Sequence, residues 1–167
     1  MVLDVIAKRT NASFKSHKAH ALVAEGKLGQ GFDAPKLVLA KSLGYMNTSG
    51  GPVANLLKFY DLKPDQLIVI HDELDIDPET IKIKFSGGHG GHNGLRDIIS
   101  AVGNDYIRIR VGIGRPPGTM DAADFVLKDF NSTERAELPT TLELAADAVE
   151  AIVTKGLTEA QQTFHST

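Results

Sequence analysis

The 167-residue sequence lacks cysteine and tryptophan, and only 6% of its residues are aromatic. Without cysteine there is no disulfide bond and no thiolate metal site, which fits a reducing compartment and leads us to expect a cytoplasmic protein. The scarcity of aromatic side chains argues against base stacking as the main way of binding nucleic acid. No apolar run approaches the roughly 18–20 residues that cross a bilayer, so we expect a soluble protein with no membrane partner.

The sequence also has no large excess of charge of either sign, since its formal net charge is −3. Bulk electrostatics therefore does not indicate a protein that binds nucleic acid. Lysine and arginine nevertheless outnumber acidic residues in segments 8–41 and 82–115, whereas acidic residues prevail in segment 129–159. This distribution permits one basic face, although an ordinary solvated surface is the simpler explanation of the charges alone.

Apolar periodicity predicts that helices and strands alternate along the chain. Helices are expected at residues 2–9, 49–61, 94–102, 131–156 and 157–164, and strands at 20–25, 36–40, 67–70, 81–85 and 106–114. Hydrophobic residues make up 42% of the chain, which is enough to form a sizeable core. We therefore predict a single α/β domain over residues 1–167, with a mixed, mostly parallel twisted sheet flanked by helices.

Segment 86–95 holds five glycines, two histidines and an asparagine between a strand-like run and a helix-like run. Glycine lets the backbone bend freely or lets a ligand approach closely. His92 and Asn93 are expected at a helix N-terminus, where free N–H groups and the helix dipole favour negative charge. A glycine-rich connection with a capping asparagine explains the same composition without any function.

Three polar pairs follow predicted strands, namely Met46-Asn47, His71-Asp72 and His92-Asn93. In open α/β sheets ligands bind beyond the carboxyl ends of the strands, so these pairs could converge on one crevice. Asparagine can orient a water or hold a carbonyl oxygen, and Asp72 could orient a histidine or accept a proton. A hydrolase of this design still needs a base, which is usually histidine.

Two other chemistries compete for the same stretch of sequence. A metal site could use His71, His89 and His92 with the acids of segment 72–77, although their spacing fits no standard signature. Phosphate groups could bind the basic residues that alternate along the strands flanking the glycine-rich segment: Lys82, Lys84, Arg108 and Arg110. Half or more of the hydrogen bonds between proteins and nucleic acids go to phosphate and sugar, so such residues suit nucleic acid.

With these residues the sequence resembles bacterial peptidyl-tRNA hydrolase. The matching motifs are Tyr-Met-Asn-Thr-Ser-Gly at 45–50, His-Asp-Glu-Leu-Asp at 71–75, Gly-Gly-His-Gly-Gly-His-Asn-Gly-Leu at 87–95, Ile-Arg-Ile-Arg-Val-Gly-Ile-Gly at 107–114 and Gly-Leu-Thr at 156–158. They cover nearly the whole chain in the family's order. The resemblance implies a monomeric α/β enzyme without metal or cofactor, which hydrolyses the ester between a peptide and the 3′ ribose of tRNA and so recycles tRNA for translation.

The resemblance also implies roles for single residues. Asp72 looks like the acid that orients and activates the family's catalytic histidine. Asn47 and Asn93 look like the pair that holds substrate and water. The resemblance further implies a peptide- and substrate-binding region and a clamp on the tRNA phosphate. The substrate-binding region comprises Met46, Gly90 and Gly91, with His92 behind the site. The phosphate clamp comprises Lys84 and Arg110, with Lys82 nearby.

One part of the family's pattern has no counterpart in this sequence. The family opens with a strand, a Gly-x-x-Asn-Pro-Gly turn and a Thr-Arg-His-Asn segment whose histidine is the catalytic base, whereas Met1 begins directly on the first predicted helix. We therefore expect an N-terminally shortened form with activity reduced by at least roughly 10²–10⁴-fold. His71 and His92 match other family positions and are not assigned as the base. The alternatives are a catalytically inactive homologue that binds RNA and a metal-dependent hydrolase that uses His89 and His92.

Overall fold

The computed structural model describes residues 1–43, 48–112 and 132–165, and the side chains of 132–137 and 165 are outside this description. The chain divides into two compact units. The first comprises residues 1, 3–69 and 85–107, and the second comprises residues 2, 70–84 and 108–167. No helix in the described ranges is long and apolar enough to cross a membrane.

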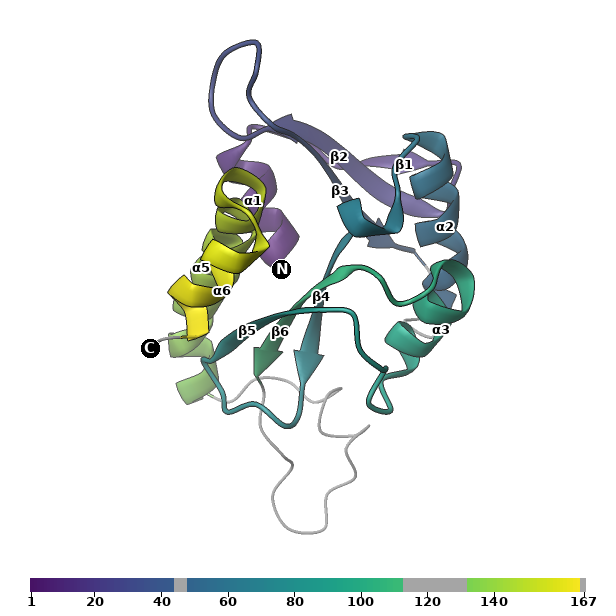
Figure 1. The fold of residues 1–167 in the computed structure, drawn as a ribbon. Coiled ribbons are helices and arrows are strands. Elements are labelled where there is room, and N and C mark those ends of the chain that lie inside the picture. Colours follow the sequence, from purple (N-terminus) through teal and green to yellow (C-terminus); the bar gives the residue numbers. More distant parts are fainter. Residues whose placement is uncertain (44–47, 113–131, 166–167) are drawn as a thin grey trace. The chain divides into compact units, whose positions relative to one another are not determined.

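The first unit contains a three-stranded antiparallel sheet in the order β1-β2-β3 (Figure 1). Helix α1 (Val2–Arg9) precedes the strands β1 (Lys15–His17), β2 (Ala21–Lys27) and β3 (Lys36–Ser42). Strands β2 and β3 pair over their full length, from Ala21 opposite Ser42 to Lys27 opposite Lys36. The expected strands at 20–25 and 36–40 are therefore confirmed, while the short strand β1 was not predicted.

Two helices complete the first unit and lie side by side (Figure 1), namely α2 (Gly50–Phe59) and α3 (Asn93–Val102). Leu56 of α2 packs with Ala21 and Val23 of β2, so α2 covers the antiparallel sheet. Leu95 and Ile98 of α3 form a second core cluster with Tyr106, against which Val53 of α2 also packs. The short 3₁₀ turn η2 (Pro64–Gln66) separates α2 from the next strand.

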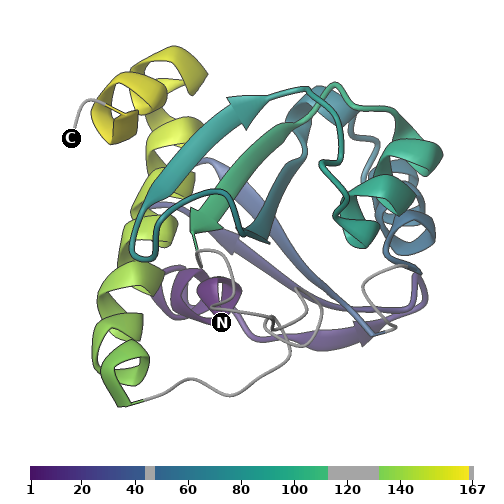
Figure 2. The same ribbon diagram turned by 90° about the horizontal axis from the view of Figure 1, so that it is seen from below.

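A second sheet has the strand order β4-β6-β5, with bounds Ile68–Glu73, Ile107–Gly112 and Ile81–Phe85 (Figure 2). Ile107 N donates to the oxygen of Leu67 at 3.0 Å, so β4 and β6 start side by side and run in parallel. Ser86 N donates to the oxygen of Tyr106, and Gly112 N donates to the oxygen of Thr80. These two bonds join opposite ends of β5 and β6, so that pair is antiparallel.

The observed pairing confirms a mixed sheet but corrects the expectation that it is mostly parallel. Among the described strands, β1 with β2 and β2 with β3 are antiparallel, and the strands form two three-stranded sheets. The connection between β2 and β3 is a short hairpin, and such a connection joins only antiparallel neighbours. Parallel pairing needs a crossover, which in the second sheet is provided by the segment between β4 and β6.

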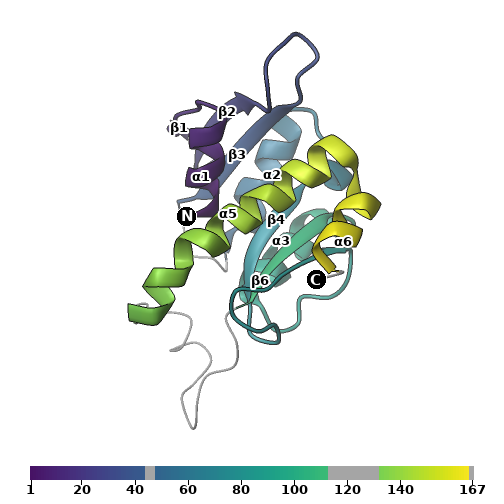
Figure 3. The same cartoon turned by 90° about the vertical axis from the view of Figure 1, so that its left-hand side faces the viewer.

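The C-terminal part of the second unit consists of α5 (Ser132–Lys155) and α6 (Leu157–His165). Gly156 separates them with a φ of +92°, a conformation that favours glycine, and α6 turns back along α5 (Figure 3). The Nε2 of Gln161 donates to the oxygen of Ile83 at 3.2 Å, so α6 is attached to β5. The predicted helix start at Asn131 and the predicted loop at 115–118 lie outside the described residues.

Candidate functional site

The glycine-rich loop of the first unit forms a tight turn before α3. Gly90 and Gly91 have φ values of +58° and +83°, which side chains other than glycine rarely adopt. A Cβ at either position would meet no atom within 4 Å, so the conformation, and not the space, requires glycine. Both residues are exposed, which leaves their backbone accessible to a ligand.

His92, and not Asn93, caps helix α3. The Nδ1 of His92 accepts a hydrogen bond from Leu95 N at 3.2 Å, while Asn93 is the first residue of the helix. The alternative interpretation, a connection with a capping asparagine, is therefore wrong about the cap, because the free N–H group of Leu95 donates to His92. Because His92 caps the helix, the exposed side chain of Asn93 can bind a ligand instead.

A cavity of about 320 Å³ opens on this face of α3, lined by Asn93, Arg96, Asp97 and Ser100. These residues are three or four positions apart, which places them on one face of the helix. The Asn93 amide and the Arg96 guanidinium offer N–H donors to an anion or a carbonyl oxygen. Such donors stabilise the negative charge that develops on a carbonyl oxygen during ester hydrolysis.

Asp97, which the sequence analysis did not select, connects helix α3 to helix α2. Its Oδ2 accepts a hydrogen bond from Gly50 N, the first residue of α2, at 2.6 Å. Ser49 gives α2 no side-chain cap, so a carboxylate from α3 replaces the usual local cap. A Cβ at Gly50 would lie 2.3 Å from the backbone oxygen of Asp97, so the helices meet there at backbone distance. The only sequence signal for Asp97 was its position one helical turn after Asn93, which places both residues on the same face of α3.

In the second unit, Asp72 and His71 lie inside the last part of β4 and not in a loop after it. His71 is buried, with 6% of its surface exposed, and its Nδ1 donates to the backbone oxygen of Asp72 at 2.8 Å. This bond fixes the orientation of the His71 ring in the strand. Asp72 is partly exposed, so its carboxylate can still face a reactant.

The predicted phosphate-binding residues Lys82, Lys84 and Arg110 belong to neighbouring strands of the second unit. Lys82 and Lys84 are exposed on β5, where they alternate with the buried Ile81 and Ile83, as the sequence pattern predicted. The hydrogen bonds that join β5 to β6 place Lys82 opposite Arg110. Lys84 is then the diagonal neighbour of Arg110 on the same face, so three cations share one face of two strands.

Arg108 does not belong to this accessible group, although it has the same strand periodicity as Arg110. Only 3% of Arg108 is exposed, so the expectation that it contacts phosphate at the surface is wrong. Strand β6 lies between β4 and β5, so Arg108 has a neighbouring strand on each side. For Arg110, which is partly exposed, Nε has no hydrogen-bond partner among the described residues.

Not every predicted site residue can be placed. Met46 and Asn47 lie outside the described residues. Asn93, His92, Gly90 and Gly91 are in the first unit, whereas Asp72, Lys82, Lys84 and Arg110 are in the second. Within the described ranges, no group of three or more histidines and carboxylates could hold a metal ion, so the alternative metal site is without support there.

Comparisons with known proteins agree with the motifs on both units. The family model for peptidyl-tRNA hydrolase matches residues 1–167. The peptidyl-tRNA hydrolase of Arthrobacter sp. (strain FB24) is 58% identical over 167 residues, covering 99% of this chain and 85% of that protein. The protein of the same name from Leifsonia xyli subsp. xyli (strain CTCB07) is 56% identical over 167 residues, covering 99% of this chain and 86% of its own length.

A solved structure gives the same result for the fold. The crystal structure of peptidyl-tRNA hydrolase from Acinetobacter baumannii matches 98% of this chain and 82% of its own chain, with 31% sequence identity and a TM-score of 0.87. This likeness confirms the predicted single-domain α/β fold class, with a mixed sheet flanked by helices. The chain therefore belongs to the peptidyl-tRNA hydrolase family, and it is an enzyme.

Proposed function

We propose that this enzyme hydrolyses the ester bond between the peptide and the tRNA of peptidyl-tRNA, which releases free tRNA for translation. The observation that carries the proposal is the match of the family model over residues 1–167. The motif residues add chemical support, because the exposed Asn93 lines a cavity with N–H donors and three cations share one face of β5 and β6. We further propose that residues 1–167 work as one domain, as a monomer in the cytoplasm.

In the proposed reaction, a water molecule attacks the ester carbonyl and the 3′ oxygen of the tRNA leaves. The amides of Asn93 and Asn47 hold the substrate and the attacking water, and their N–H groups can stabilise the charge on the carbonyl oxygen. Asp72 supplies the carboxylate that orients a histidine base. His92 supports Asn93 as its helix cap. Met46, Gly90 and Gly91 contact the substrate.

The tRNA part of the substrate is bound, in this proposal, by Lys82, Lys84 and Arg110. A guanidinium group and two ammonium groups on one face suit the oxygen atoms of a phosphate. These contacts position the substrate without reading its sequence, because phosphate carries no sequence information. They therefore fit an enzyme that accepts many different tRNAs.

The proposal also concerns the general base of the reaction. The family's Thr-Arg-His-Asn segment has no counterpart among the 167 residues, and none of the six histidines stands in such a motif. We therefore propose that a form extended by this segment hydrolyses peptidyl-tRNA roughly 10²–10⁴-fold faster than residues 1–167.

The test is a peptidyl-tRNA hydrolysis assay with residues 1–167, with the extended form, and with Asn93→Ala in each. Faster release of tRNA by the extended form, and its loss in the Asn93→Ala variant, support the proposal. If neither form releases tRNA while both bind it, the inactive RNA-binding homologue becomes the better description. Equal activity of the two forms would refute the proposed base.

A further inference from the structure

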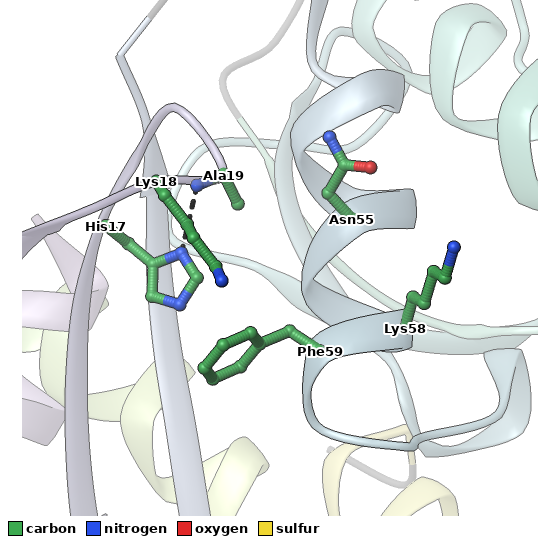
Figure 4. Close-up of a pocket in the computed structure, with 6 residues that line it drawn as sticks. All are labelled: His17, Lys18, Ala19, Asn55, Lys58 and Phe59. Carbon is green, nitrogen blue, oxygen red and sulfur yellow. Dashed lines mark hydrogen bonds between the residues drawn. The ribbon is translucent and has the colours of Figure 1, made fainter.

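A second cavity of the first unit, of about 390 Å³, lies between α2 and the segment that joins β1 to β2 (Figure 4). His17, Lys18 and Ala19 line it from the end of β1 and the turn before β2, and Asn55, Lys58 and Phe59 line it from α2. The three residues of α2 are spaced by three and four positions, so they project from one face of its last turns. None of these six residues belongs to the site proposed above.

Phe59 gives this cavity an exposed aromatic surface. Its side chain is 53% exposed, whereas Leu56 and Leu57 of the same helix are buried. The ring is held on two sides, since the rings of His17 and Tyr60 meet it edge-on at centroid distances of 4.6 and 4.9 Å. The Nζ of Lys18 lies 5.1 Å from the ring centroid. The ring is thus fixed in place without being covered by the core.

The polar groups around the ring are cations and hydrogen-bond donors. Lys18 and Lys58 are exposed, and no carboxylate is among the residues that line the cavity. The Nδ1 of His17 accepts a hydrogen bond from Ala19 N at 3.0 Å, so the neutral ring carries its proton on Nε2 and donates there. Asn55 adds an amide that can donate and accept. Cations beside an open aromatic ring are the combination that binds a phosphate together with a base.

We propose that this cavity is a second RNA contact of the enzyme, in which Lys18 and Lys58 bind phosphate and Phe59 stacks on a base of the substrate's tRNA. The inference rests on the proposed function for the identity of the RNA. Lys58 follows Gly50 by eight residues, which corresponds to about 12 Å along α2. A substrate that contacts both ends of α2 must therefore extend over about 12 Å. The low aromatic content argued against stacking in general, and Phe59 is a local exception.

The experiment compares Lys18→Gln/Lys58→Gln and Phe59→Leu with the matched control Lys27→Gln/Lys36→Gln. The control removes the same charge from exposed positions of the β2–β3 hairpin. Binding of deacylated tRNA is measured by fluorescence anisotropy over a range of salt concentrations. We expect the lysine pair of the cavity to lower the salt slope of binding by roughly two. Phe59→Leu should weaken binding about fivefold or more, and Phe59→Tyr should keep it, because tyrosine also stacks.

Hydrolysis provides a second readout, with peptidyl-tRNA and with a peptidyl ester of adenosine alone. The cavity variants should raise KM for peptidyl-tRNA, leave kcat unchanged, and have no effect on the adenosine ester, which lacks the further nucleotides that the cavity is proposed to bind. Equal tRNA binding by the wild-type protein and the cavity variants would overturn the inference, as would an equal loss in the control pair or in Phe59→Tyr. If the wild-type protein binds tRNA through the cavity but hydrolyses nothing, the proposed function fails and the RNA contact stands.

Discussion

Replacing Asp97 by alanine tests whether α2 and α3 are joined as the structure describes. The carboxylate of Asp97 accepts a hydrogen bond from the first N–H group of α2 at 2.6 Å, in a partly buried place. Loss of a helix cap costs about 1 kcal/mol, and loss of a negative charge at a helix N-terminus costs about 0.3–1 kcal/mol more. A hydrogen bond to a charged group contributes about 1.5–3 kcal/mol in total. We therefore expect the free energy of unfolding to fall by about 2 kcal/mol.

Urea unfolding, followed by circular dichroism, measures this difference directly. Asp33→Ala is the control, because Asp33 is an exposed carboxylate in the β2–β3 connection and its loss should change stability by less than about 0.5 kcal/mol. Gly50→Ala probes the same contact from α2, since the new Cβ would lie 2.3 Å from the oxygen of Asp97 and force the helices apart. We expect that substitution to cost about 1–3 kcal/mol.

The stability of the double variant Asp97→Ala/Gly50→Ala can also be predicted. Asp97→Ala removes the carboxylate contact with the new Cβ but leaves the closer backbone oxygen in place, so most of the crowding that Gly50→Ala creates remains. The double variant should therefore remain less stable than Asp97→Ala alone. If Asp97→Ala matches the Asp33→Ala control, or if Gly50→Ala leaves stability unchanged, the described junction of α2 and α3 is wrong.

Three further predictions concern the chemistry. Asn93→Ala should lower kcat for peptidyl-tRNA by roughly 10²–10³-fold while the unfolding midpoint stays unchanged, and an unchanged kcat would remove Asn93 from the reaction. Lys84→Gln and Arg110→Gln should each raise KM and reduce the salt slope of tRNA binding by about one, which a titration at several salt concentrations checks. Burial and the hydrogen bond to Glu25 raise the pKa of Tyr60 to about 12. The folded state then favours the protonated tyrosine, so stability should fall between about pH 10 and 12, and Tyr60→Phe should weaken that fall.

The local pattern of the sequence was sufficient for most helices and strands. The alternation of apolar and basic residues predicted β5 at its observed bounds, and the glycine-rich segment predicted the entry into α3. The strand order was not predictable in this way, because β6 pairs with both β4 and β5 through contacts that are distant in sequence. Arg108 and Arg110 share the periodicity of β6, yet Arg108 is buried and Arg110 is partly exposed, so strand periodicity alone did not predict the burial of Arg108.

In the candidate site, too, features set by the local sequence were predicted, whereas features that depend on contacts distant in sequence were not. Asn93, Gly90 and Gly91 were predicted as site residues from a short motif, and the positive φ values of the two glycines are a local property of that motif. Asp97 was missed because its partner Gly50 is 47 residues away, and no local rule connects an acid in one helix to the start of another. The cavity at Phe59 was missed for a related reason, since periodicity gave an aromatic residue on a helix and only the structure showed it to be exposed.

The central proposal is that Asn93 takes part in the hydrolysis of peptidyl-tRNA, and that a form extended by the family's Thr-Arg-His-Asn segment has the histidine base that the 167 residues lack. The most direct measurement is the rate of tRNA release from peptidyl-tRNA by residues 1–167 and by the form extended with that segment. The account predicts release that is roughly 10²–10⁴-fold faster in the extended form and that is lost in its Asn93→Ala variant. Two folded forms that bind tRNA but release none, or an Asn93→Ala variant as fast as its parent, would contradict it.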